Sequence, residues 1–428
     1  MRRARSATQN WLRSIYAAVS PLFVTGVALK VVVRSSFSLP LVALLVIGEF
    51  AACDAPTLNE PVASPTVSAL ATPSSALALA SPAALGPAGP QALAFQTYDG
   101  SGEVVHPDVV RFPETWNGYQ LWSTLTPYAR SSTLLENPSV FASHDGESWD
   151  VPLSVTNPLA RTTRGYLSDP DLVFEPRTGA LWMYYREVEH ARGANGKTTH
   201  VADNVWLMTS DDGRRWSVPT KVAADSGRYV VSPSVVRTAD GDWRMYQVDA
   251  GTAGCSAKAS RVTVRRSADG ITWSSRKASG LGQPGYVPWH LDVQYIESRG
   301  EYWALTAAYK SGRGCMTSSL FLATSRDGFT WTTYPSSVLA PGEFAPFSAA
   351  VYRSTFAVTS PDSVTIWYSG ARVATPKRGK TPAIFAWSAA ISPMRVDSLF
   401  ARVRSSTRAK NGSVALAGAE GSFSKSAP

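Results

Sequence analysis

The 428-residue sequence contains only three cysteines and five histidines. These residue types build most zinc, iron and copper sites in proteins. With so few of them in a chain of this length, no metal ligands are predicted.

Long uninterrupted apolar runs are also scarce. The run Leu39–Phe50 is interrupted by Glu49 and is short for a membrane-spanning helix. Arg34 precedes the run and Ala51-Ala52-Cys53 follows it, which is the pattern of a secretory signal. Small residues directly before a cysteine resemble the lipobox of bacterial lipoproteins, in which Cys53 would carry the lipid. Cleaved secretion and a transmembrane anchor remain as alternatives.

This pattern leads us to expect an exported protein, on the cell surface or the periplasmic side, anchored to the membrane through Cys53. Residues 1–53 would be the export signal, and the Ala/Pro/Ser-rich stretch 54–94 a disordered tether. A globular domain would occupy 95–400, and 401–428 would be a disordered tail.

A basic stripe with interleaved aromatic residues is absent as well. The formal net charge is +9, but residues 1–34 hold six basic residues, and the segment 402–425 holds five against Glu420. Because the excess positive charge lies at the two ends, nucleic-acid binding is not expected. The chain is expected to be a monomer.

What the sequence does contain is a short phrase that returns four times: serine, any residue, Asp-Gly, two residues, tryptophan. Asp-Gly favours a tight hairpin turn, because glycine accepts a positive φ and aspartate can bond its own backbone. The predicted role is a stabilising turn without chemistry. The copies are Ser143–Trp149, Ser210–Trp216, Ser267–Trp273 and Ser325–Trp331, 57 to 67 residues apart.

A second phrase runs in step with the first and opens each unit with polar residues that lead into a strand. The openings are His106–Val110, Asp169–Val173, Ser232–Val236, His290–Gln294 and Phe347–Val351, the last centred on Ser348. No helical period competes between residues 100 and 395. Five units of four strands predict an all-β fold, a five-bladed β-propeller with four-stranded blades.

Cys255 and Cys315 lie 12 and 10 residues before the hairpin serines of adjacent units. Equivalent positions in neighbouring sheets are close in space, so these two residues are predicted to form a disulfide.

The opening phrases converge on one funnel around the axis of such a ring, and they bring acidic residues. Asp108, Asp169, Asp171 and Asp292 stand in these phrases. Carboxylates gathered around a pocket suit glycoside cleavage, where one protonates the leaving oxygen and the other activates water or attacks carbon. The candidate substrate-binding residues are Glu136, Arg186, Trp289, His290 and Asp292. No cofactor is expected, although the channel could hold a structural cation.

The phrases Asp169–Phe174 and Ser-x-Asp-Gly-x-x-Trp resemble those of the five-bladed propeller glycosidases of glycoside hydrolase families 43 and 32, over about residues 100–395. The resemblance implies that Asp108 is the base or nucleophile and that Asp169 or Asp171 tunes its pKa. The general acid of these families is a glutamate that opens unit three, where this chain has Val231–Ser234. Glu187, Glu136 or a histidine would then have to act as the general acid.

Two functions follow from these patterns. The first is a membrane-tethered glycoside hydrolase that acts on a poly- or oligosaccharide through Asp108, Asp171, Asp169 and Glu187. The second is a carbohydrate-binding or scaffolding propeller that has lost the acid, because unit three opens on serine. In both interpretations the partner is a carbohydrate.

Overall fold

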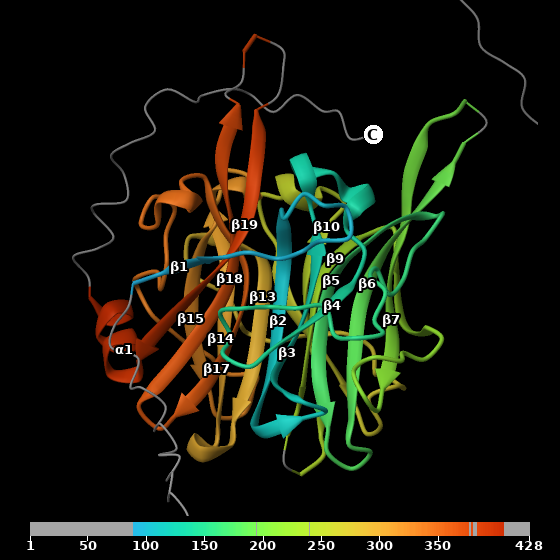
Figure 1. Cartoon of the computed structure of the whole chain (residues 1–428). Helices are drawn as coiled ribbons and strands as arrows, with labels where there is room; N and C mark the ends of the chain where they lie inside the picture. The colour runs from blue at the N-terminus through green and yellow to red at the C-terminus, as the bar shows by residue number, and fades with distance from the viewer. Residues whose placement is uncertain (1–88, 194, 239, 376–377, 380–382, 406–428) are drawn as a thin grey trace, which may run out of the picture. The chain divides into compact units, whose positions relative to one another are not determined.

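The computed structural model of the chain describes residues 89–193, 195–238, 240–375, 378–379 and 383–405 (Figure 1). The predicted export signal, the lipidation site at Cys53 and nearly all of the predicted tether lie outside the described residues. Among the residues that are described, no helix is both long enough and apolar enough to cross a membrane.

The described residues form five antiparallel sheets, taken here in chain order. The first three are β2 (Val104–Trp116), β3 (Tyr119–Pro127), β4 (Ser139–Ser143); β5 (Gly165–Glu175), β6 (Ala180–Arg192), β7 (Thr198–Ser210), β8 (Thr220–Ser226); and β9 (Tyr229–Arg237), β10 (Trp243–Gly251), β11 (Arg261–Ser267), β12 (Lys277–Ala278). The others are β13 (Tyr286–Ile296), β14 (Glu301–Lys310), β15 (Ser319–Ser325), β16 (Thr332–Thr333); and β17 (Ala350–Ser360), β18 (Ser363–Thr375), β19 (Ile384–Arg395) with β1 (Gln91–Leu93).

Helical segments are short and lie between or after these strands. One α-helix, α1 (Val396–Arg404), follows β19 in the described part of the chain. The 3-10 turns are η1 (Ala129–Ser131), η2 (Thr133–Leu135), η3 (Gly254–Ser256), η4 (Glu297–Arg299), η5 (Cys315–Thr317) and η6 (Ala345–Phe347). Both β1 and α1 reach beyond the predicted limits 95–400, so the folded unit extends slightly further at each end.

The first strands of the five sheets contact one another in a closed cycle: β2 with β5, β5 with β9, β9 with β13, β13 with β17, and β17 again with β2. In Figure 1 these long strands run side by side. The prediction of an all-β fold made of four-stranded antiparallel sheets is confirmed for four sheets. The sheet of β2–β4 has three strands in the described residues, and its fourth place holds only a bridge between Ala142 and Asp150.

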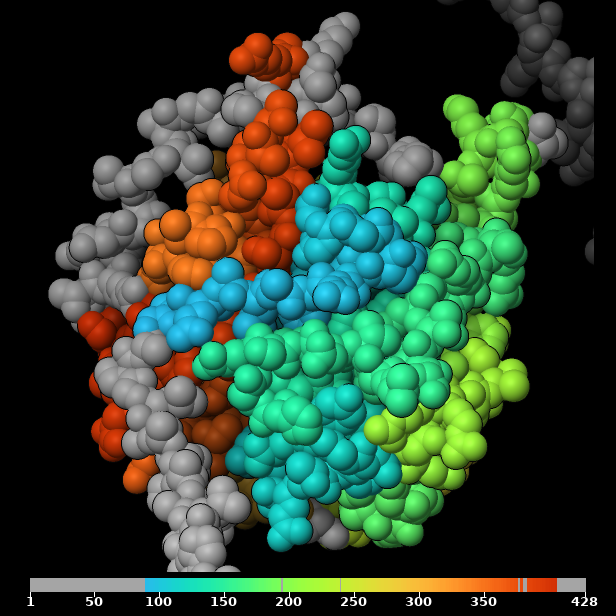
Figure 2. Space-filling model, viewed as in Figure 1, coloured from blue at the N-terminus to red at the C-terminus, as the bar shows by residue number. Residues whose placement is uncertain are grey.

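Strand β1 pairs with β19 and so completes the last sheet with residues from the start of the described chain. Figure 2 shows this segment in blue, lying against the red C-terminal strands.

The hairpin phrase makes the turn that its residues predict. The Ser143 hydroxyl accepts the N–H of Gly146 at 2.8 Å, and Asp145 Oδ1 accepts the next two backbone N–H groups, also at 2.8 Å. Gly146 has φ 82°, which is the left-handed region that glycine tolerates best. The Trp149 indole donates to the Gly146 carbonyl at 3.0 Å and closes the turn.

Each of these turns also docks on an aromatic residue of the preceding sheet. Trp367 donates to the carbonyl of Gly146, Tyr184 to that of Gly270 and Tyr246 to that of Gly328. The remaining turn packs so closely that a Cβ on Gly213 would lie 2.2 Å from the Trp122 ring. The phrase therefore joins neighbouring sheets, which explains its recurrence in structural terms.

Cys255 in η3 and Cys315 in η5 form the predicted disulfide, with their Cα atoms 5.1 Å apart and a sequence separation of 60. The bond joins the sheets of β9–β12 and β13–β16.

Replacing both cysteines by serine is expected to lower the free energy of unfolding by roughly 2 to 4 kcal/mol, because the crosslink restricts the unfolded chain. Urea unfolding followed by tryptophan fluorescence would measure this loss. The wild type kept in reductant is the control and should unfold at the same urea concentration as the double variant. Equal midpoints for the variant and the oxidised wild type would show that the crosslink is dispensable.

Candidate active site

The inner strands share an irregularity near the middle of the fold. Pairing of β2 with β3 and of β5 with β6 shifts register at His106-Pro107 and Asp169-Pro170 respectively. His106, Asp169 and Ser232, each directly before a proline, have φ of 57°, 49° and 58°. A left-handed residue other than glycine costs roughly 1 to 3 kcal/mol and is concentrated at functional sites. Bulges of this kind re-aim side chains, and here they bring side chains of separate sheets together.

The side chains brought together are His106 of β2, Asp169 of β5 and His290 of β13, which we call the His–Asp–His cluster. The nearest approaches to Asp169 Oδ1 are His290 Nδ1 at 3.0 Å and His106 Nε2 at 3.6 Å. All three residues are at most 3% exposed. Each offers one ligand atom, and the three atoms lie within 4.8 Å of one another.

Two ring nitrogens of this cluster, His106 Nε2 and His290 Nε2, have no hydrogen-bond partner among the described residues, and Asp169 Oδ1 has ion-pair contacts, the shortest to His290 Nδ1 at 3.0 Å. Buried polar atoms without partners are rare and need an explanation. Two imidazoles and one carboxylate are a common protein ligand set for zinc, iron and related divalent ions. The cluster therefore fits a divalent metal ion.

Surrounding groups hold these side chains in place. The Nδ1 atom of His106 lies 3.1 Å from the Thr126 hydroxyl, so the opposite ring nitrogen is left free. The other Asp169 oxygen, Oδ2, accepts a hydrogen bond from Ser168 at 2.9 Å and lies 3.5 Å from Arg186 Nη1. Arg186 is in turn fixed by Asp203, whose Oδ2 lies 2.8 Å from Arg186 Nη2. Such supporting contacts are typical around metal ligands.

The protonation states also suit a cation. Burial lowers the pKa of His106 and of His290, which favours the neutral imidazole, while the Asp169 carboxylate opposes this effect. Burial alone would raise the pKa of Asp169, but the neighbouring His106, His290 and Arg186 side chains outweigh it and hold that pKa well below its usual range. Neutral imidazoles and an ionised carboxylate are the forms that bind metal.

Glu136 follows η2 and lies on the outer side of His106, with Oε2 3.6 Å from His106 Nδ1. Burial and the negative charge of Asp169 raise the pKa of Glu136 well above its usual value. A carboxyl whose pKa is raised holds a proton more readily, which suits it to general acid–base catalysis.

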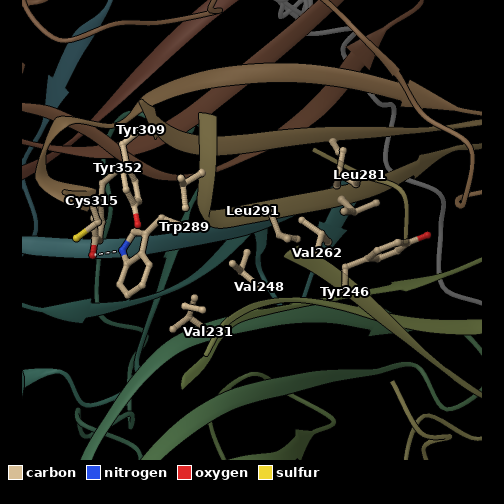
Figure 3. Packing of buried hydrophobic residues seen from close by; sticks show 14 of the residues in the cluster. Val231, Tyr246, Val248, Val262, Leu281, Trp289, Leu291, Tyr309, Cys315 and Tyr352 are labelled. Atoms are coloured by element: carbon tan, nitrogen blue, oxygen red, sulfur yellow. Dashed lines mark hydrogen bonds between the residues drawn. The ribbon is translucent and has the colours of Figure 1, made fainter. Parts of the chain in front are cut away.

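Aromatic residues form the wall behind the two imidazoles. Tyr352 lies with its ring centre 4.3 Å from that of His290 and 5.7 Å from that of His106. The Trp289 indole donates to the Tyr352 hydroxyl at 2.7 Å, a contact drawn as a dashed line in Figure 3. Trp289, a predicted substrate-binding residue, is 8% exposed and holds Tyr352 in place through this hydrogen bond.

Asp108, Asp171 and Asp292 form a second group, which we call the triple-Asp cluster. Their closest oxygen atoms also lie within 4.8 Å of one another, and each residue is at most 2% exposed. The side chains therefore do face a common centre.

Two of these carboxylates connect inner strands. Asp108 accepts the backbone N–H of Leu172, and Asp171 accepts that of Val235 at 2.8 Å. Burial raises the pKa of Asp108, and burial together with Asp108 raises that of Asp171. These contacts give both residues a structural role between adjacent sheets.

Glu187 lies apart from both clusters. It neighbours Arg186 on β6, so the two side chains point to opposite faces of the sheet. Its carboxylate forms an ion pair with Arg164 at 2.9 Å. Burial would raise its pKa, but hydrogen bonds led by those from Thr162 and Trp206 outweigh burial and lower it. A carboxylate that stays ionised does not suit the role of proton donor.

No protein-family model matches the chain. The sequence is 30% identical over 316 residues to the A type blood N-acetyl-α-D-galactosamine deacetylase of Flavonifractor plautii. That match covers 62% of this chain and 40% of the relative, so the chain spans less than half of its length.

Among solved structures, an N-acetylgalactosamine deacetylase from F. plautii in complex with blood group B trisaccharide superposes with a TM-score of 0.63 and 26% identity. The match covers 73% of this chain and 97% of that one. An α-L-arabinofuranosidase of Fusarium graminearum matches with a TM-score of 0.47 and 14% identity, over 73% of this chain and 99% of that one, too distant to support an argument. The sequence relative and the nearer structure act on carbohydrate.

Sequence reasoning missed His106 of the His–Asp–His cluster and two residues of β17 that contact the clusters: Tyr352, which packs on His290, and Arg353, whose Nη2 lies 3.0 Å from Asp171 Oδ1. His106 stands in the first opening phrase at the same place as Asp169 and His290 in theirs, so that register could have identified it. The other two were missed because the fifth opening was assigned wrongly. Ser348 lies before β17, directly after η6, whereas Tyr352 and Arg353 occupy the register shift of β17 with β18.

Proposed function

We propose that the five sheets are the blades of a five-bladed β-propeller and that the protein is a metal-dependent carbohydrate N-deacetylase. It would hydrolyse the acetamide of an N-acetylated amino sugar. The observation that carries this proposal is the His–Asp–His cluster, whose three buried residues each offer a ligand atom within 4.8 Å of the others, beside the Glu136 carboxyl. The relationship to the F. plautii deacetylase supports the substrate class.

His106, Asp169 and His290 would hold the ion. When bound, a divalent ion would supply Lewis-acid activation of the attacking water and of the amide carbonyl. Water adds its oxygen to the carbonyl carbon, the C–N bond breaks, and acetate and a free amine form. Glu136 would take a proton from the water and deliver a proton to the leaving nitrogen. The sequence-based expectation of no metal and no cofactor is not tested by these observations, and this proposal replaces it.

Glycoside cleavage, the function favoured by the sequence patterns, has less support from the geometry. Asp108 and Asp171 already accept backbone N–H groups of the adjacent strands, which gives both carboxylates a structural role. Glu187 is ionised and points away from both clusters. Any carboxylate pair that cleaved a glycosidic bond would need contact with the sugar.

Acetate release from glycans that end in N-acetylgalactosamine or N-acetylglucosamine would test the proposal. We expect acetate and a free amine in equal amounts, with activity lost after treatment with EDTA and restored by a divalent ion. Formation of new reducing ends without acetate would instead identify a glycosidase. Binding of the same glycans with neither product would identify a carbohydrate-binding protein.

We also propose that the chain is exported and tethered through a lipid on Cys53, and that it acts as a monomer. The basis is the sequence pattern around Cys53. Mass spectrometry of the protein from a bacterial membrane fraction would detect a diacylglyceryl cysteine at the mature N-terminus, and a soluble chain starting elsewhere would exclude the anchor.

A further inference from the structure

The two clusters are stacked layers built by the same three strands. Strand β2 supplies His106 and Asp108, strand β5 supplies Asp169 and Asp171, and strand β13 supplies His290 and Asp292. Arg353 contacts Asp171 of one cluster and Asp169 of the other, so the two clusters are neighbours. The fold thus creates two neighbouring sets of three metal-type ligands, one nitrogen-rich and one made only of carboxylates.

Strand β17 contributes Arg353 at the level of the His–Asp–His cluster. Thr355 of β17 pairs with Trp367, as Asp171 pairs with Tyr184. Trp367 and Tyr184 are equivalent because each donates to the glycine carbonyl of a hairpin phrase. Arg353, two residues before Thr355, therefore occupies the position that corresponds to Asp169.

The Arg353 side chain reaches from this position to the carboxylates of both layers. Its Nη2 atom lies 3.0 Å from Asp171 Oδ1 and donates to the Pro233 carbonyl at 3.1 Å, and its Nη1 atom lies 3.8 Å from Asp169 Oδ1. Arg353 is 0% exposed, one of the largest side chains buried to this degree. Its positive charge is therefore enclosed with the carboxylates.

The charge of the triple-Asp cluster requires such a partner. Three buried carboxyl groups in one place are unstable unless they are protonated or compensated by a cation. Asp108 Oδ1 and the Nε and Nη1 atoms of Arg353 have no hydrogen-bond partner among the described residues, so they interact mainly through charge.

We propose that Arg353 is a built-in cation that takes the place of a second metal ion in the triple-Asp cluster and thereby confines metal binding to the His–Asp–His cluster. This inference rests on the proposed function only for the metal ion in the His–Asp–His cluster. A guanidinium remains charged at every physiological pH and is fixed by its planar fork. Hard divalent ions such as Mn²⁺ prefer carboxylate oxygens, so removing the guanidinium should open a second site.

The test is the metal content of Arg353→Met after incubation of the full chain with excess Mn²⁺ and removal of unbound ion by gel filtration. We expect one Mn²⁺ per chain in the wild type and two in the variant. Arg353→Lys, which keeps the charge, should stay at one. In Arg353→Met combined with Asp292→Asn, the loss of one carboxylate ligand should return the value to one. Arg299→Met, at an exposed arginine of η4, is the matched control and should also bind one.

The outcomes separate the two proposals. A wild type with no Mn²⁺ and a variant with one would contradict the metal of the proposed function while supporting the role of Arg353. One Mn²⁺ in both the wild type and Arg353→Met would overturn the role of Arg353 and would leave the metal of the His–Asp–His cluster in place.

Thermal stability gives a second readout, which serves when Arg353→Met is purified only in the presence of the ion. Mn²⁺ should raise the melting temperature of the variant more than that of the wild type, and an equal rise in both would contradict the inference. If the single variant cannot be purified, the double variant with Asp292→Asn should be recovered in soluble form because it also removes a carboxylate. Failure of both variants to fold would count against charge compensation.

Discussion

Replacing Asp169 by asparagine is expected to lower the bound metal from one ion per chain to nearly none and acetate release by roughly a thousand-fold or more. Lewis-acid activation is worth several kcal/mol, and each 1.36 kcal/mol corresponds to about a factor of ten in rate. Asparagine is the informative substitution because it tolerates the left-handed backbone that Asp169 adopts, at φ 49°. The variant therefore removes the charge of the ligand and keeps the local conformation. Metal analysis and acetate release on the same preparation would measure both effects.

Asp108→Asn is the matched control, since it also neutralises a buried aspartate on a neighbouring strand. The amide oxygen of asparagine can still accept the N–H of Leu172, so the contact between sheets is kept. We expect this variant to bind one ion and to release acetate within a few-fold of the wild type. Full activity in Asp169→Asn, or loss of activity only in Asp108→Asn, would refute the assigned site and return attention to the triple-Asp cluster.

Glu136→Gln is expected to lower kcat by about 10² to 10⁴, the usual contribution of general acid–base catalysis. KM should change little, and the metal should remain, because Glu136 lies beside His106 without belonging to the ligand set. Steady-state kinetics with metal analysis would show this separation. It distinguishes a proton-transfer group from a residue that merely supports the fold.

The pH profile provides a further check on Glu136. The ionised carboxylate must accept the proton of water, so wild-type kcat/KM should rise with pH through the raised pKa of Glu136. Glutamine does not titrate, and the variant should lack this rise. Glu189→Gln is the control: Glu189 lies on β6 beside Arg164 and Asn204, and its loss should leave the profile unchanged. Equal profiles for the wild type and Glu136→Gln would remove Glu136 from the mechanism.

Local patterns explain why much of the fold could be predicted. The hairpin phrase Ser143–Trp149 contains nearly all of the hydrogen bonds that form its turn, so its meaning is readable from seven residues. The pairing of Cys255 with Cys315 followed from the same spacing of units. Asp169, His290 and Glu136 entered the candidate set because acidic and polar residues stand at corresponding places in successive units.

The arrangement within the site could not be predicted in the same way. A β-bulge leaves little trace in sequence, and the bulges at His106 and Asp169 determine which side chains meet. The fifth opening, Arg353-Ser354-Thr355, has neither the proline of the first three openings nor the aspartate of the first, second and fourth, so Arg353 gave no recurrent signal. Glu187 could have been set aside earlier, because it follows Arg186 directly on a strand and strand neighbours face opposite sides.

The pairing of β1 with β19 has a consequence for biosynthesis. Gln91–Leu93 leaves the ribosome early, yet its hydrogen-bonding partner, Ala389–Ile391, is translated only after every other strand. The last sheet cannot be completed until then, and until it is, the aromatic residues between the first and last sheets stay exposed to solvent and to chaperones. Under the proposed export, this delay would keep the chain unfolded until it has crossed the membrane, because the strand that completes the last sheet is made last.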